Sequence, residues 1–213
     1  MMGKPSRFWN FIARRYARMP VQDEATYREK LARTQSYLRP DWEVLEIGCG
    51  TGSTALEHAP HVGRIRAIDS SPKMIEICRE KAAGTENVRF DLAALDDLDV
   101  GDNSVDAVLA MSLLHLLDNR DAAIRRVHSM LRPGGIFVSS TSCVAGMDNV
   151  FIRYLLPAGA ALGLLPRIAR FSRSELRRSM EDAGFQIEQD WLPHDNPAKA
   201  VFMVARKPEL PAS

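Results

Sequence analysis

Three glycines that alternate with single residues, Gly48, Gly50 and Gly52, form the feature of this chain whose spacing most clearly predicts chemistry. Glycine lets a backbone turn sharply and approach a ligand closely. Glu46 precedes the first of them by two residues and adds a carboxylate at the same point. That carboxylate would repel a pyrophosphate and attract a ligand with an ammonium or sulfonium charge. The loop therefore predicts a nucleotide-like ligand that carries positive charge.

Two other glycine loops fit this segment less well. The dinucleotide fingerprint has its third glycine three residues after its second, and Ser53 occupies that position here. A P-loop needs a lysine and then a serine or threonine after its last glycine, and neither follows Gly52. A P-loop is therefore excluded, and a nicotinamide oxidoreductase is left as a weaker alternative.

One aspartate is placed to bind a sugar. Asp69 lies about 20 residues beyond the glycine loop, at the end of the next expected strand. An acidic residue in that place accepts hydrogen bonds from both hydroxyls of a ribose. Several adenosine ligands carry such a ribose, so Asp69 indicates the class of ligand without choosing among its members.

The other reactive side chains predict less. Cys49, Cys78 and Cys143 form no C-x-x-C pair and no metal-ligand spacing, so we expect no metal site and a reducing, cytoplasmic compartment. His115 is a weak candidate for a base, because a histidine titrates near neutral pH. A packed or capping histidine is the interpretation that we favour, and the catalytic residue is unassigned.

The elements that must position these residues alternate between strand and helix. Phe8, Ile12, Tyr16 and Met19 recur at helical spacing, and Pro20 ends that helix. A second helix is expected over 23–38. Two further helix starts are predicted from caps, one at Ser71 followed by Pro72 and one at the capping box of Ser172 and Glu175. The expected strands are 43–47, 64–68, 88–90, 106–111, 136–140, 185–191 and 200–205. This alternation predicts a parallel sheet with helices on both faces and an antiparallel hairpin at its end.

Taken together, these segments resemble the class I S-adenosylmethionine-dependent methyltransferase superfamily, especially its small-molecule, type 11-like branch. The matching segments are 44–52, 68–72, 104–106, 114–115 and 131–135, and the resemblance covers residues 42–207. It implies an α/β, Rossmann-like, doubly wound seven-stranded sheet of order 3-2-1-4-5-7-6, with the seventh strand antiparallel. The N-terminal helices, 1–40, would form a cap on the core, 41–207, and 208–213 would be a disordered tail.

The resemblance also implies which residues contact S-adenosylmethionine. Gly48, Cys49 and Gly50 would line its methionine part, and Glu46 would orient the loop or reach the amino group through water. The other residues implied to contact the cofactor are Tyr16 (as a cover), Asp69 (ribose), Ser70 and Met74 (adenine), Met111 (amino group, through its carbonyl), Ala94 and Leu95.

One position departs from the family pattern. Members often have a Gly-Asp pair after the third strand, and its acid accepts a hydrogen bond from the adenine amino group. Ala93 and Ala94 stand there in this chain. The amide of Leu95 can still donate to the ring. Losing one hydrogen bond costs about 1 kcal/mol, so we expect weaker binding of the cofactor and not its loss.

The remaining sequence limits which partners this chain can have. The formal net charge is +1, so no nucleic-acid partner is expected, and we expect the basic N-terminal helix face to be solvated. No apolar run approaches the roughly 18–20 residues of a membrane span. The apolar stretch within 145–170 is interpreted as a substrate lid, a dimer contact or plain core, in a monomer or a homodimer.

We therefore expect methyl transfer to a small, rather apolar molecule, with S-adenosylhomocysteine as product. A non-catalytic cofactor-binding or regulatory protein is the alternative.

Overall fold

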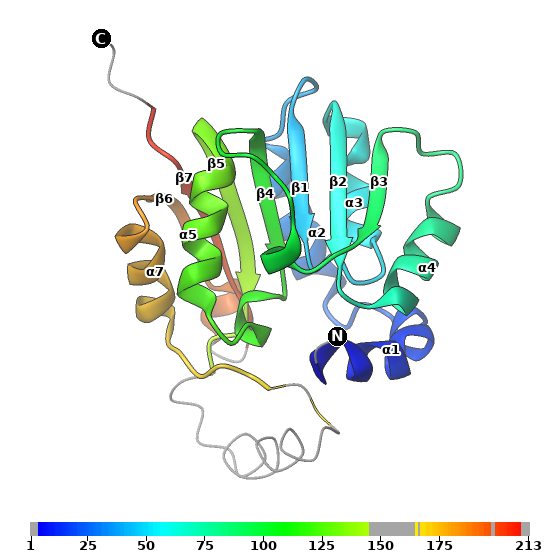
Figure 1. Cartoon of the computed structure of the whole chain (residues 1–213). Helices are drawn as coiled ribbons and strands as arrows, with labels where there is room; N and C mark the ends of the chain where they lie inside the picture. The colour runs from blue at the N-terminus through cyan, green and yellow to red at the C-terminus, as the bar shows by residue number, and fades with distance from the viewer. Residues whose placement is uncertain (1–3, 145–164, 166, 197–198, 210–213) are drawn as a thin grey trace.

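The computed structural model describes residues 4–144, 165, 167–196 and 199–209, and a seven-stranded sheet lies at its centre (Figure 1). The strand order is β3-β2-β1-β4-β5-β7-β6, and β7 runs antiparallel to both of its neighbours. The strands are β1 (Glu43–Ile47), β2 (Arg64–Asp69), β3 (Val88–Leu92), β4 (Val105–Met111), β5 (Leu131–Thr141), β6 (Gln186–Trp191) and β7 (Val201–Arg206). The expected fold class and strand order are confirmed.

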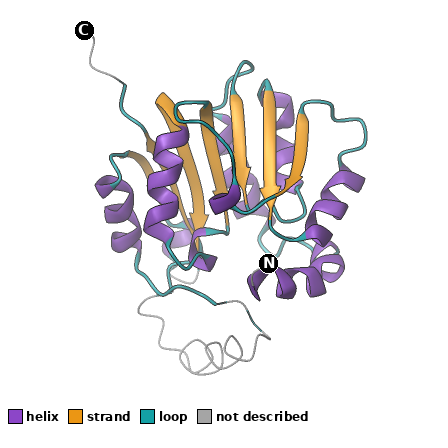
Figure 2. Ribbon diagram, in the orientation of Figure 1, coloured by secondary structure: helices purple, strands orange, loops and turns teal. Residues whose placement is uncertain are grey.

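Helices cover both faces of this sheet (Figure 2). They are α1 (Lys4–Ala17), α2 (Glu24–Gln35), α3 (Ser53–His58), α4 (Pro72–Lys81), α5 (Arg120–Met130) and α7 (Arg173–Asp182). One core layer joins a sheet face to α3, α4 and the turn that follows α2, and the other joins the opposite face to α5 and α7. The central strands are buried on both sides, which explains why β4 reads as a nearly continuous apolar run.

Two helix starts follow the predicted capping chemistry. The Ser71 side chain accepts a hydrogen bond from the Met74 amide, and Pro72 takes the first position of α4. Ser172 and Glu175 form the expected capping box at the start of α7. Because each cap satisfies amides that have no partner within the helix, the sequence fixes where these helices begin.

Two expected boundaries were wrong. Strand β5 begins at Leu131, five residues before the expected start, because the Pro133 to Gly135 segment continues it past an irregularity in its pairing with β4. Helix α2 ends at Gln35, and the next residues form a turn instead of carrying the helix to Leu38.

The buried face of α1 is a different one from the stripe that recurs at helical spacing. The structure packs Trp9, Ala13 and Ala17 toward Met74 and Ile77, which are buried residues of α4. The predicted stripe of Phe8, Ile12, Tyr16 and Met19 is not the buried one, and Tyr16 and Met19 are exposed. Ala13 and Ala17 are small, so α1 and α4 can approach closely at this contact.

The expected apolar insertion lies largely outside the described residues. Of 145–170, the structure describes only 165 and 167–170, and of the expected tail it describes only 208 and 209. Within the described residues, no helix is both long enough and apolar enough to cross a lipid bilayer.

Candidate cofactor site

The glycine loop follows β1 at the carboxyl edge of the sheet, the edge at which doubly wound sheets bind ligands (Figure 1). Gly48, Gly50 and Gly52 all have positive φ, at 67°, 54° and 76°. A Cβ at Gly48 would lie 2.6 Å from Leu113, and one at Gly52 would lie 2.8 Å from Phe90. A Cβ at Gly50 would meet no atom within 4 Å. Two glycines therefore allow close packing, and Gly50 leaves an open backbone surface.

Asp69 joins this loop to the start of α4. One carboxylate oxygen accepts from the Gly50 amide at 3.0 Å, and the other accepts from the Ser71 amide at 2.8 Å. Burial raises the pKa of Asp69, and its backbone hydrogen bonds act in the opposite direction. A carboxylate has about four lone-pair sites. Acceptor capacity therefore remains on Asp69 after both amides are bound.

Glu46 is a buried carboxylate, and one of its oxygen atoms lacks a hydrogen-bond partner among the described residues. Its side chain is 1 % exposed, and its Oε2 atom has no hydrogen-bond partner among the residues that the structure describes. Burial raises the pKa of Glu46 to about 8, and the negative charge of Asp69 contributes to that shift. An unpaired buried acceptor costs free energy unless a partner arrives. Glu46 is thus suited to meet a cationic group from a ligand.

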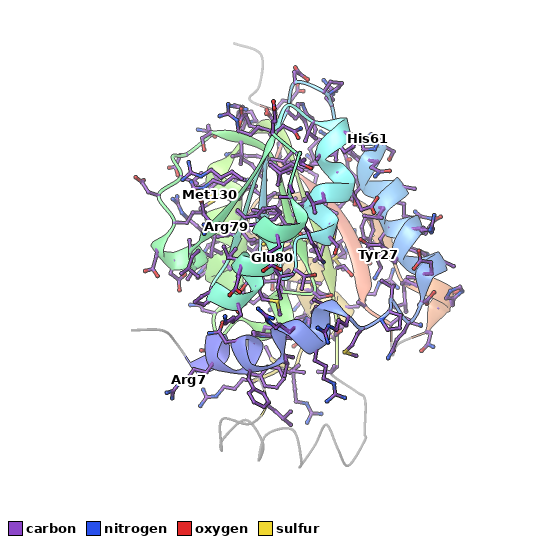
Figure 3. All side chains as sticks on the ribbon, turned by 90° about the vertical axis from the view of Figure 1, so that its right-hand side faces the viewer. Arg7, Tyr27, His61, Arg79, Glu80 and Met130 are labelled. Carbon is purple, nitrogen blue, oxygen red and sulfur yellow. The ribbon has the colours of Figure 1, made fainter. Side chains whose placement is uncertain are left out.

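A tyrosine that the sequence did not single out lies on α2, near the glycine loop. Tyr27 lies on α2 (Figure 3) and is half-buried. Its side chain forms a hydrogen bond with Thr54, just after the glycine loop. Burial raises the pKa of Tyr27, and the charge of Glu46 adds to that effect. Tyr16, the predicted cover, is 44 % exposed, and its ring meets Trp9 edge-on at 5.9 Å. Its role as a cover stays a prediction.

The Ala93-Ala94 pair, on the side of the site predicted to bind adenine, lies at the end of β3. The Ala93 amide donates to the Asp69 carbonyl at 3.1 Å, so the Ala93-Ala94 pair lies next to the predicted ribose-binding residue. Ala94 precedes the short 3-10 turn that begins at Leu95, and its methyl group offers no acceptor. Ser70 is exposed between β2 and α4, while Met74 is buried in the contact with α1. Their contacts with adenine stay predictions.

The fold brings two cysteines together that are far apart in sequence. Cys49 and Cys78 are both buried, and the Cys78 thiol donates to the Gly50 carbonyl at 3.1 Å. A hydrogen bond with Cys78, together with burial, raises the pKa of the Cys49 thiol. A thiol with a raised pKa is a poor nucleophile at neutral pH. Cys49 is therefore a buried packing residue of the loop and not a nucleophile.

Polar groups also gather at the carboxyl ends of β4 and β5. The buried Ser139 Oγ, Thr141 Oγ1 and His115 Nδ1 atoms have no hydrogen-bond partner among the described residues. Burial lowers the pKa of His115 to about 4, so its ring is neutral at pH 7. Met111 ends β4, and the next residue, Ser112, has a φ of 59°. These groups lie on the edge where an acceptor would have to approach Gly50.

Lys30 brings a cationic side chain from α2 to the carboxyl end of β5. Its ammonium group donates to Ser140 Oγ at 2.8 Å and to the Ala200 carbonyl at 3.3 Å. Burial lowers the pKa of Lys30 to about 8. Sequence periodicity gave no signal for Lys30 or Tyr27, because both depend on how α2 lies across the sheet. In the part of the chain that the structure describes, no cluster of three metal-ligating side chains occurs.

Comparison with known proteins identifies the family. Residues 44–135, which include the glycine loop and Asp69, match the family described as methyltransferase domain. The match spans less than half of this chain, and together with the relatives below it supports a class I S-adenosylmethionine-dependent methyltransferase. S-adenosylmethionine is accordingly its cofactor, and the open Gly50 and the unpaired Glu46 carboxylate fit that ligand.

Individual relatives share this architecture. A demethylmenaquinone methyltransferase of Tropheryma whipplei is 29 % identical over 182 residues, which cover 78 % of this chain and 75 % of that protein. A chain from the complex of the Haloferax volcanii Trm112 methyltransferase activator with a candidate methyltransferase has a TM-score of 0.79 at 18 % identity, covering 98 % of this chain and 100 % of the other.

A third comparison is with a protein solved with ligands. The geranyl diphosphate C-methyltransferase of Streptomyces coelicolor A3(2), in complex with Mg²⁺, geranyl diphosphate and S-adenosyl-L-homocysteine, has a TM-score of 0.69 at 16 % identity. The match covers 86 % of this chain and 79 % of that one. At these identities the solved structures support the fold alone.

Proposed function

We propose that this chain transfers the methyl group of S-adenosylmethionine to a small, rather apolar acceptor. The observation that carries the proposal is Glu46, a buried carboxylate with an unpaired oxygen directly before a glycine loop whose Gly50 is open. The cofactor carries an ammonium group and a sulfonium group, and either would offset the cost of burying that charge. A pyrophosphate would increase the cost.

Each residue of the site has a role in holding the cofactor. Glu46 attracts the positive end, and Asp69 accepts from the ribose hydroxyls while it holds the Gly50 amide. Tyr27 covers the loop from α2 on the side of Glu46. The Met111 carbonyl is available near the amino group, as the family pattern implies. When bound, the cofactor supplies a methyl group on a sulfonium sulfur, which is a good leaving group.

Positioning, not proton transfer, accounts for the rate in this proposal. His115 is neutral at pH 7 but a weak base, since burial lowers its pKa to about 4. An acceptor held in line with the methyl group gains much of its rate from orientation alone. The buried hydroxyls of Ser139 and Thr141 can orient such an acceptor. The name of the Tropheryma whipplei relative supports a small molecule such as a menaquinone precursor.

Calorimetric titration tests the cofactor half of the proposal. We expect S-adenosylmethionine and S-adenosylhomocysteine to bind and NAD not to bind. Asp69→Ala should weaken both affinities at least tenfold. Asp41→Ala, at the exposed opposite edge of the sheet, is the matched control and should change neither. Binding of NAD alone, or an unchanged affinity in Asp69→Ala, would contradict the proposal.

A screen with methyl-labelled cofactor tests the transfer half. We expect label to move from the cofactor into an organic-soluble product of a cell extract. The alternative is a non-catalytic cofactor-binding or regulatory protein, and the missing acceptor at Ala94 is the observation that favours it. Tight cofactor binding without labelled product from any extract would support that alternative.

A further inference from the structure

Helix α1 presents an outer face that combines aromatic, aliphatic and basic side chains. We define this outer face as Arg7, Phe8, Phe11, Ile12, Arg14, Arg15 and Arg18. Phe11 at its centre is 90 % exposed. A phenylalanine so exposed loses the free energy that burial of its ring would provide. The outer face therefore carries apolar surface that the described fold does not use.

Helical geometry explains why these side chains share one side. Successive residues of an α-helix are rotated by about 100°. Ala13 is fully buried against α4, and Phe11 lies two residues away, nearly on the opposite side of the helix. Arg7, Arg15 and Arg18 are placed around Phe11 by the same rotation. Figure 3 shows α1 along the margin of the molecule, with Arg7 pointing away from the body.

The charge of this segment is one-sided. Residues 1–22 contain five of the 28 basic residues and none of the 27 acidic ones. Arg14 reaches Glu76 of α4 at 3.3 Å, in an exposed pair. Arg7, Arg15 and Arg18 form no ion pair within the described residues. These three positive charges are thus free to meet an anionic partner.

The apolar surface continues beyond the helix. Met19 is 52 % exposed, and Val21 is 48 % exposed. Helices that lie in a membrane interface carry apolar side chains that enter the acyl boundary and Lys or Arg side chains that stay at the headgroups. Arginine stems cover apolar surface while their guanidinium groups stay among the headgroups. The outer face has this composition.

We propose that α1 docks the protein on an anionic lipid surface, with Phe11 inserted and Arg7, Arg15 and Arg18 among the headgroups. A second copy of the chain would bring like charges together across a symmetric contact. A nucleic acid would use the arginines and Phe11 but not the aliphatic Ile12, Met19 and Val21. Anionic lipid uses both kinds of side chain. The proposal does not depend on methyl transfer.

Vesicle sedimentation of the full chain tests this docking. The probes are phosphatidylcholine vesicles with and without about one third phosphatidylglycerol, in low and in high salt. We expect binding only to the anionic vesicles, and weaker binding in high salt because exposed charges are screened. Phe11→Asp and the double variant Arg15→Glu, Arg18→Glu should each lower the bound fraction at least tenfold.

A charge-matched variant controls for net charge. Arg125→Glu with Arg178→Glu makes the same change on exposed positions of α5 and α7, and it should bind vesicles like the unaltered chain. Cofactor titration of Phe11→Asp reports the site separately, so loss of docking can be distinguished from loss of the proposed function. No binding to anionic vesicles, or equal binding by Phe11→Asp, would overturn the proposal. So would a dimer in light scattering that Phe11→Asp converts to a monomer, or binding of a single-stranded oligonucleotide in place of vesicles.

Discussion

At the scale of single residues, Glu46 couples the stability of the fold to pH. Its folded pKa of about 8 lies above the ordinary value of 4.5, because burial disfavours the charged form. The folded state therefore holds a proton that the unfolded state releases, and stability falls as pH rises from about 4.5 to about 8. The Glu46→Gln substitution removes this pH-dependent loss of stability. Urea unfolding should show the variant about 2–4 kcal/mol more stable than the unaltered chain at pH 8 and nearly equal at pH 4.5.

The same substitution should have the opposite effect on the ligand. Without the carboxylate, the cofactor loses a buried partner for its positive charge, so its affinity should fall at least tenfold. Glu43→Gln, at the other end of the same strand, is the matched control for both measurements. Parallel stability profiles of Glu46→Gln and the unaltered chain over this pH range would contradict the assigned role.

A hydrogen-bond acceptor at position 94 should raise the affinity of the protein for adenine. Ala94→Asp restores the acceptor that family members often have, and one hydrogen bond is worth about 1 kcal/mol, or roughly fivefold in affinity. Calorimetry with S-adenosylhomocysteine should show that gain. S-inosylhomocysteine lacks the adenine amino group and should show none. An equal gain for both ligands would mean that the acid acts elsewhere.

The sequence predicted part of this site and missed the rest for a physical reason. The glycine loop and Asp69 are local in sequence, and their spacing follows from how a strand turns into a helix. Tyr27 and Lys30 reach the site only because α2 lies across one face of the sheet. Local periodicity carries no information on that placement. The meeting of Cys49 and Cys78 depends on tertiary contact in the same way.

At the scale of elements, one asparagine holds α1 on the core. The Asn10 side-chain oxygen accepts from Ser71 Oγ at 2.7 Å and from the Lys73 amide at 3.1 Å. Asn10→Ala leaves both donors without this partner, which should cost about 1–2 kcal/mol and loosen α1. Hydrogen exchange should then become faster in α1 and remain unchanged in β4. Asn10→Asp keeps an acceptor oxygen and should restore protection. Unchanged exchange in Asn10→Ala would show that Ala13 packing alone holds the helix.

Element types were easier to predict than the faces that elements bury. Alternating strands and helices gave the sheet, and the caps at Ser71 and Ser172 gave two helix starts. In α1 the periodicity predicted the helix, but it did not predict which side is buried. An isolated pattern assumes that the most apolar stripe faces inward. Here Ala13 faces inward and Phe11 faces outward, because α1 lies at the margin against one short helix.

At the scale of the whole molecule, the bound cofactor should stabilise the folded state by contacting several elements at one edge of the sheet. The site residues come from the ends of β1, β2 and β4 and from α2, so a bound ligand connects elements that are distant in sequence. A ligand at a hundred times its Kd stabilises the folded state by about 2.7 kcal/mol. For a chain of this length that corresponds to a rise in Tm of about 5–10 °C.

The rise in Tm should depend on pH and on which ligand is bound. At pH 8 Glu46 is about half ionised in the free protein and a cationic ligand favours its charged form, whereas at pH 6 Glu46 is protonated and binding must first remove its proton. At a fixed ligand concentration, thermal unfolding should therefore show a larger rise with S-adenosylmethionine at pH 8 than at pH 6, and none with NAD. Glu46→Gln should give the same rise at both values. A larger rise at pH 6 in the unaltered chain would mean that the charge of Glu46 opposes the cofactor.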